Sequence, residues 1–229
     1  IRGLLLARRH GSASVALLVD YAKHAALLTV GLLVYAQLRP RLAPFPWWLR
    51  EAGDGLCFTL LIAVTMSMPL MLPGDVRIDL RTTLVCLSVV FGGPLCGAIA
   101  AIGGLALRQA MGGPASAAGM MLVVFPYVMT IAYVKAAARW RHKIGYGDLV
   151  AIGVLLDLLR LGVWLIAFGY AFTLASMNLI WFGVCALVVV NMVLLGSAVL
   201  LVEERHALAR SVADSEARFR SVVDQLPEG

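Results

Sequence analysis

Two ionisable side chains, Asp157 and Arg160, lie well inside an apolar run at residues 147–170. Their i,i+3 spacing puts both on one face of a helix. An ionisable group at that depth in a membrane costs roughly 2.5 to 3.5 kcal/mol on insertion scales, so both should face the inside of a helix bundle. They form either a structural ion pair or part of a polar pocket or relay, and the residues alone leave both alternatives open.

A second group of charges precedes another apolar run. Asp75, Arg77, Asp79 and Arg81 alternate acid and base, and Arg108 closes the run that follows. Because side chains of an extended chain alternate between two faces, an extended segment would present all four on one side, whereas a helix would scatter them. One interpretation is a self-neutralised loop, and the other is a functional site to which these charges belong.

No catalytic or metal-binding motif accompanies these charges. The sequence has no Walker loop, no His-Glu-x-x-His and no Gly-x-Ser-x-Gly. His10, His142 and His206 fall outside the apolar runs, and only His24 lies in one, which gives little support for haem or copper. We therefore expect no cofactor, no metal and no catalytic residue in this stretch, and any enzyme activity would belong to another part of the protein.

The composition is that of an integral membrane protein, with 61% hydrophobic and 14% charged residues. A formal net charge of +6 would suggest nucleic acid in a soluble protein, but here Arg and Lys collect beside apolar runs. That arrangement is typical of a cytoplasmic membrane face, so we expect no nucleic-acid partner. The cysteines all lie in apolar segments without a Cys-x-x-Cys pair, which favours free thiols over disulfides or metal ligands: Cys57, Cys86, Cys96 and Cys185.

Six apolar runs are long enough to cross a bilayer, which predicts an all-α polytopic bundle of about six transmembrane helices. The runs are residues 15–38, 55–72, 84–107, 115–138, 147–170 and 178–202. Gly92, Gly93 and Pro94 interrupt the third run. A continuous helix over residues 80–107 would measure roughly 42 Å against a hydrocarbon core of about 30 Å, so a tilt, a break at these residues or an interfacial start must absorb the excess.

The orientation follows from the basic residues. The strongest internal basic segment is residues 135–143, and positive-inside reasoning places it in the cytoplasm. Six spans put both termini on the same side, so we expect both to be cytoplasmic. Arg39, Arg41 and Arg50 fall on the other side in this arrangement and are the main observation against it.

Four short motifs resemble the bacterial five-transmembrane receptor domain of LytS type in order and spacing. They are Pro73-Gly74, Asp79-x-Arg81, Phe91-Gly92-Gly93-Pro94-x-x-Gly97 and Arg108-x-x-x-Gly112-Gly113. The resemblance covers about residues 56–203. It implies a sensor in the bacterial inner membrane whose site includes Asp79, Arg81 and Arg108, to which we add Asp157 and Arg160. A fainter likeness to the S components of vitamin transporters implies a solute-binding membrane fold.

The last part of the chain reads as an output helix, charged and continuous with the last span. Steps of four and three residues form a heptad seam, which predicts a homodimer. The seam is Leu201, Arg205, Leu208, Val212, Ser215, Phe219, Val222 and Leu226. Residues 215–229 resemble the opening of a PAS domain. In proteins similar to this one the output is commonly a cyclic-di-GMP synthase or hydrolase (GGDEF or EAL), or a histidine kinase.

We divide the chain into four parts. Residues 1–54 hold an N-terminal cytoplasmic segment, a first helix and an external loop, 55–202 the sensory domain, 203–214 a linker helix and 215–229 the start of a PAS domain. The sequence opens without Met, so we expect a piece of a longer protein. The predicted function is a sensory input domain that responds to an unknown small ligand or a membrane condition, most simply coupled to cyclic-di-GMP output. The alternatives are a histidine kinase input domain or a solute-binding transporter component, although a transporter needs no PAS opening.

Overall fold

The computed structural model describes the backbone of residues 2–42, 44–68, 70–72, 76–78, 80–112, 116–140, 144–168 and 180–223. Side chains are described for residues 22–42, 44–68, 80–112, 116–140 and 144–167 and for most of 188–219. All statements below concern these residues. Asp79, Cys185 and the last six residues of the PAS-like segment lie outside them.

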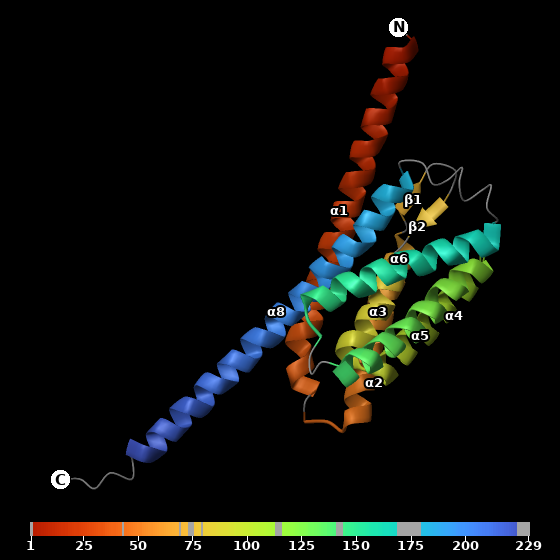
Figure 1. The fold of residues 1–229 in the computed structure, drawn as a ribbon. Coiled ribbons are helices and arrows are strands. Elements are labelled where there is room, and N and C mark those ends of the chain that lie inside the picture. The colour runs from red at the N-terminus through yellow and green to blue at the C-terminus, as the bar shows by residue number, and fades with distance from the viewer. Residues whose placement is uncertain are drawn as a thin grey trace.

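The described chain is a helical bundle with one small hairpin, which confirms the predicted fold class (Figure 1). The helices are α1 Arg2–Leu42, α2 Trp47–Ser67, α3 Arg81–Gly92, α4 Pro94–Met111, α5 Ser116–Trp140, α6 Tyr146–Phe168 and α8 Ile180–Val223. Strands β1 Leu70–Leu72 and β2 Val76–Ile78 pair antiparallel, with Leu70 opposite Ile78. Three helical segments are long and apolar enough to cross a membrane, namely Pro94–Met111, Ser116–Trp140 and Tyr146–Ala167.

The third apolar run is two helices, α3 and α4, so among a tilt, a break and an interfacial start the structure shows the break. Gly93 between them has a φ of 93°, a conformation that costs glycine little, and Pro94 starts α4 where no N–H is needed. A methyl group on Gly97 would lie 2.3 Å from Cγ2 of Val89, so α4 folds back against α3. The two helices therefore run antiparallel, and this reversal absorbs the excess length of the run.

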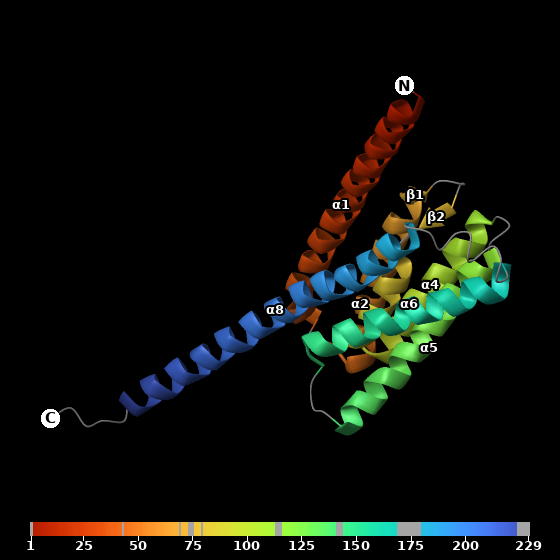
Figure 2. The same cartoon turned by 45° about the horizontal axis from the view of Figure 1, so that its top comes forward.

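The reversal changes the number of passes through the bundle. Seven described helices alternate in direction, so α1 begins at one end of the bundle and α8 ends at the other (Figures 1 and 2). The expectation that both termini are cytoplasmic depended on six membrane passes, and the side of the membrane that each terminus faces stays a prediction. Arg39, Arg41 and Arg50 now lie at the same end as Lys135, which removes the main observation against the positive-inside assignment of that end.

The second helix also differs from the predicted span. It begins at Trp47, directly after Pro46, instead of at residue 55, and it ends at Ser67 because residues 70–72 form strand β1. Charged residues in its first two turns hide this part of the helix from a hydropathy pattern. The loop after α1 is therefore short, and the predicted external segment belongs largely to the bundle.

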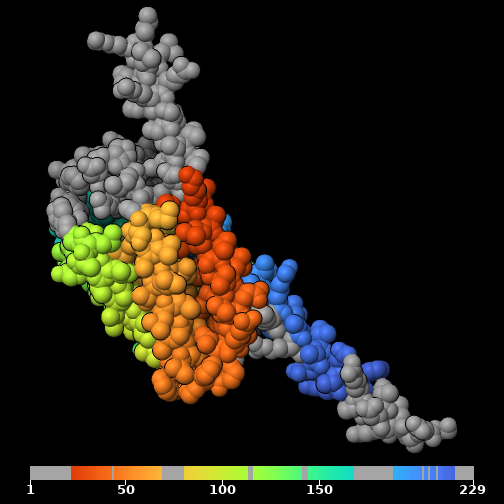
Figure 3. Space-filling model, turned by 180° about the vertical axis from the view of Figure 1, so that it is seen from behind, coloured from red at the N-terminus to blue at the C-terminus, as the bar shows by residue number. Residues whose placement is uncertain are grey.

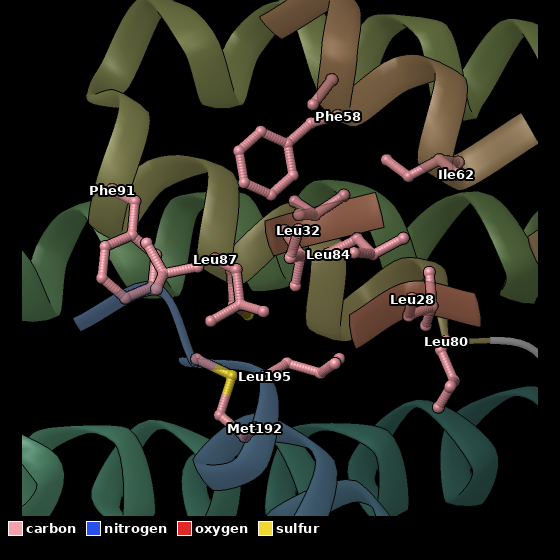
Figure 4. Packing of buried hydrophobic residues seen from close by; sticks show 14 of the residues in the cluster. Leu28, Leu32, Phe58, Ile62, Leu80, Leu84, Leu87, Phe91, Met192 and Leu195 are labelled. Atoms are coloured by element: carbon pink, nitrogen blue, oxygen red, sulfur yellow. The ribbon is translucent and has the colours of Figure 1, made fainter. Parts of the chain in front are cut away.

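Helix α3 is the centre of the bundle. All of its residues except Val90 are buried, and it packs against α2, α4 and α5 and also meets α6 and α8. Figure 4 shows Leu84 and Leu87 of α3 among Phe58 of α2 and Met192 of α8. A helix of this length measures ~18 Å, too short for a hydrocarbon core of ~30 Å, but other helices surround it and supply a partner at its C-terminal end.

The end of α3 is held by an arginine of α1. Nη2 of Arg39 donates a hydrogen bond of 2.5 Å to the carbonyl oxygen of Phe91, one of the helix-end carbonyls that have no helical partner. Nε of Arg39 also lies 3.8 Å from Oδ2 of Asp54, whose side chain is buried. A cation, a helix C-terminus and a buried carboxylate thus stabilise one another.

The start of α4 is held by a glutamate of α2. The backbone N–H of Leu95 donates to Oε2 of Glu51 at 3.0 Å, which satisfies one of the free N–H groups of the first turn. Close by, the hydroxyl of Tyr127 in α5 donates to the carbonyl oxygen of Pro94 at 3.2 Å. Helices α1, α2 and α5 therefore all anchor the turn between α3 and α4.

The last helix continues without a break from the bundle to Val223, which confirms the predicted continuity of the last span with the charged helix. Within the bundle it packs on α1 and α6. Beyond the bundle it stands free of the other helices, as Figures 1 and 3 show. Figure 3, which views the molecule from behind, also shows α1, α2 and α4 side by side.

The close contact of α2 with α4 leads to a first prediction. A methyl group on Gly55 would lie 2.8 Å from Cβ of Ile99 and 3.0 Å from the backbone oxygen of Cys96, atoms that cannot move aside easily. We expect Gly55→Ala to lower the free energy of unfolding by about 1–3 kcal/mol, measured by thermal or SDS unfolding in detergent. Gly162→Ala is the control, because nothing lies within 4 Å of the added methyl. Equal stability of the two variants would contradict the packing described.

Candidate functional site

Two of the predicted site residues, Arg81 and Arg108, converge on the first turn of α5. A methyl group on Gly119 would lie 2.5 Å from Nε of Arg108 and 3.1 Å from Nη2 of Arg81. Arg81 is the first residue of α3 and Arg108 lies in the last turn of α4. Because these helices are antiparallel, the start of one and the end of the other meet at the same end of the bundle.

The electrostatics of the two arginines differ. Arg108 at the C-terminus of α4 is favoured by the helix dipole, whereas Arg81 at the N-terminus of α3 is not. Arg81 is also buried, with 7% of its surface exposed. Two guanidinium groups this close repel each other, which favours the binding of an anion beside them.

Arg108 also carries a group that no described residue satisfies. Its Nε is enclosed and makes no hydrogen bond within the described part of the chain. A buried N–H donor that lacks a partner costs roughly 1–3 kcal/mol, and more for a charged group. An acceptor from outside the described residues, such as a carboxylate, would relieve this cost.

The hairpin that precedes Arg81 shows whether part of the segment with alternating charges is extended. Strand β2, Val76–Ile78, is extended, as the period of two predicts for this segment. Asp75 and Asp79 lie outside the described residues. The inclusion of Asp79 in the site therefore stays a prediction.

The second predicted pair lies on α6, which packs against the α5 helix that carries Gly119. Val163 of α6 packs with Ala118 and Leu122, which lie one residue before and three residues after Gly119. Arg160 precedes Val163 by one turn and is buried, with 6% of its surface exposed, and Asp157 is half-buried one turn further along. Both charges thus lie against the protein interior, as their depth in the apolar run required.

Arg81 and Arg108 together present several N–H donors at one end of the bundle. Arginine guanidinium groups remain protonated and present forked donors, which suit carboxylates and phosphates. No group of His, Cys, Asp and Glu within the described residues could hold a metal ion. The two guanidinium groups near Gly119 are therefore suited to an anion.

Sequence reasoning missed two parts of this architecture. Gly119 carries no signal of its own, since only the antiparallel return of α4 brings two arginines to it. The other part is the network of Arg39, Glu51 and Asp54. The sequence predicts an external loop there, because these charges interrupt the apolar pattern. The i,i+3 spacing of Glu51 and Asp54, in the first two turns after Pro46, is the signal that could have indicated a helix start.

Comparison with known proteins gives one family. The family described as 5TMR of 5TMR-LYT matches residues 48–205, from the first turn of α2 into α8. This range agrees with the resemblance over about residues 56–203. No curated protein and no solved structure matches the chain.

The pair on α6 leads to a second prediction. Asp157→Ala leaves Arg160 inside the bundle, and we expect it to destabilise the protein more than the double change of Asp157 and Arg160 to Ala. The single change costs about 3–5 kcal/mol for a fully buried pair and less here, because Asp157 is half-buried. Unfolding in detergent measures this, with Leu158→Ala on the exposed face as the control. We further expect the double variant to reach the membrane but lose its stimulus response, so a full response would remove both residues from the site.

Proposed function

Because the chain belongs to the LytS-type five-transmembrane receptor family, 5TMR-LYT, we propose that it senses a small organic anion held between Arg81 and Arg108. The family match supports a membrane sensory input domain of a signalling receptor. The observation that carries the ligand class is the convergence of two guanidinium groups on Gly119. A carboxylate accepts two parallel hydrogen bonds from one arginine and can engage a second, which makes small carboxylic acids the first candidates.

The signal would travel through α3. Arg81 begins this helix, and α3 packs along α2, α4 and α5 and meets α8. An anion that draws Arg81 and Arg108 together would move the ends of α3 and α4 relative to each other. Since packed cores switch between discrete arrangements, a small movement there can shift α8. Buried residues of α8 that lie in this core are Val188, Asn191, Met192, Leu195 and Val199.

We infer that the end of the bundle from which α8 emerges faces the cytoplasm. Arg39, Arg41, Arg50, Lys135 and Arg139 gather at this end, where α1 and α5 end and α2 begins. An excess of Arg and Lys is typical of the cytoplasmic side. The Arg81 and Arg108 site then lies near the external face, where it can meet a ligand from outside the cell.

The output side of the proposal depends on the sequence. The PAS-like segment, residues 215–229, supports a cytoplasmic PAS module, and cyclic-di-GMP synthesis or hydrolysis is the output we propose. A histidine kinase is the alternative. Assay of the full-length protein for cyclic-di-GMP turnover and for autophosphorylation distinguishes the two outputs.

The ligand class gives a third prediction. In nanodiscs, a panel of small mono- and dicarboxylates, phosphate and sulfate should contain a compound that raises the melting temperature, since a ligand at a hundred times its Kd adds about 2.7 kcal/mol. We expect Arg81→Gln and Arg108→Gln to abolish this rise. Arg41→Gln, an exposed arginine at the other end of the bundle, is the matched control.

Two outcomes would contradict the proposed ligand site. One is stabilisation of the Arg108→Gln variant equal to that of the unmodified protein. The other is a panel without effect on a protein whose full-length form still responds to its stimulus in cells. In both cases the arginines would have a role in folding alone.

The free part of α8 gives a fourth prediction. Leu208 and Val212 lie on the proposed seam and are each 65% exposed, so a second copy of the chain can cover them. We expect Leu208→Cys and Val212→Cys to crosslink between copies in membranes several-fold more strongly than Ala209→Cys, which lies off the seam. Equal crosslinking at all three positions would rule out this dimer seam.

A further inference from the structure

A cavity of about 300 Å³ lies at the proposed cytoplasmic end of the bundle, away from Arg81 and Arg108. Its walls come from α1, α2, the turn between α3 and α4, and α5. The charged residues that line it are Arg39, Arg50, Glu51, Asp54 and Lys135. Val89, Val90, Ile131 and Val134 add an apolar wall. A cavity with apolar walls and a few polar groups is typical of a small-ligand site.

The acidic side of the cavity carries two carboxylates, those of Glu51 and Asp54. Oε2 of Glu51 accepts the Leu95 N–H, and Oδ2 of Asp54 lies 3.8 Å from Nε of Arg39. Asp54 is 1% exposed, and its Oδ1 forms no hydrogen bond with any described residue. The Tyr35 hydroxyl interacts with this carboxylate, although neither the hydroxyl nor Oδ1 has a hydrogen bond of ordinary geometry within the described chain. A buried carboxylate oxygen of this kind favours a donor from a ligand.

The basic side of the cavity is open to an anion. Arg50 and Lys135 form no ion pair with a described residue, and Arg39 is engaged with Phe91 and Asp54. Arg50 lies half-buried on α2 and Lys135 lies exposed on α5. The cavity thus offers two cations on one side and a carboxylate oxygen on the other, which is the pattern that complements a zwitterion.

Exposed aromatic side chains place the cavity at the level of the membrane interface. Trp47 and Trp48 precede Arg50 by one turn or less, and Trp140 follows Lys135 at the end of α5. Each of these side chains is more than half exposed. Tryptophan gathers where lipid headgroups meet the hydrocarbon core. A lipid headgroup is therefore the zwitterion that this cavity can meet in its own layer.

We propose that the cavity binds the headgroup of a phosphatidylethanolamine lipid. The phosphate lies between Arg50 and Lys135, the primary ammonium group donates a hydrogen bond to Oδ1 of Asp54, and the apolar wall of α3 and α5 receives the first methylenes of the lipid. A phosphate alone would leave Asp54 unsatisfied and would face two carboxylates. A choline headgroup has no N–H donor for Asp54. The bound lipid would join α2 and α5 beside the turn between α3 and α4.

Native mass spectrometry of the purified protein, after exchange into nanodiscs of defined lipids, tests this assignment. In phosphatidylcholine discs with equal small fractions of phosphatidylethanolamine and phosphatidylglycerol, we expect at least tenfold preferential retention of phosphatidylethanolamine. Lys135→Gln should reduce this retention severalfold, and Asp54→Asn should remove the preference over phosphatidylcholine. Arg139→Gln, exposed at the same end but outside the cavity, should leave retention unchanged.

Lys135 is exposed, so its substitution tests the proposal even if Asp54→Asn fails to fold. Equal retention of all three lipids, or retention unaffected by Lys135→Gln, would overturn the proposal. Preference for phosphatidylglycerol would mean that the site reads negative charge alone, which also overturns it. Free phosphoethanolamine added to phosphatidylcholine discs separates the lipid from a soluble source, because displacement of the bound lipid by this compound at equal concentration would contradict a lipid ligand.

Discussion

The structure depends on how the turn between α3 and α4 is stabilised at the charged end of the bundle. A helix end in a membrane leaves carbonyl and N–H groups without partners, and each such group costs several kcal/mol in hydrocarbon. Here Arg39 donates to the carbonyl of Phe91, and Glu51 accepts from the N–H of Leu95. The buried carboxylate of Asp54 lies 3.8 Å from Nε of Arg39 and neutralises its charge. These charges satisfy backbone groups that the break at Gly93 leaves without helical partners.

The reversal at Gly93 places the functional groups. Because α4 returns along α3, Arg81 and Arg108 meet at Gly119 although they lie far apart in the chain. The same reversal leaves α3 short and enclosed, so that it contacts helices of both the receptor site and the output side. One turn thus links the proposed anion site, the core and the helix that leaves the bundle.

The sequence predicted the elements better than their directions. Gly92, Gly93 and Pro94 indicate a break by their own chemistry, and the apolar runs on either side of residue 145 predict α5 and α6 closely. The direction of α4 after the break depends on partners on α1 and α2, and no local pattern contains them. For the same reason, Arg81 and Arg108 were proposed from resemblance, while Asp157 and Arg160 followed from the cost of charge at depth. Asp54 was missed because a carboxylate in an early helical turn resembles a loop residue.

The most direct test of the account is the side of the membrane on which α2 and α4 end. Ser67→Cys and Gln109→Cys would be introduced separately, in a variant whose four native cysteines are replaced. Each would then be treated in intact cells with a membrane-impermeant thiol reagent. Both positions are exposed at the end of the bundle opposite Lys135, so the account predicts that both are labelled from outside. Labelling of one position from outside and the other only after lysis would mean that residues 81–111 form a single span, and would contradict a shared site for Arg81 and Arg108.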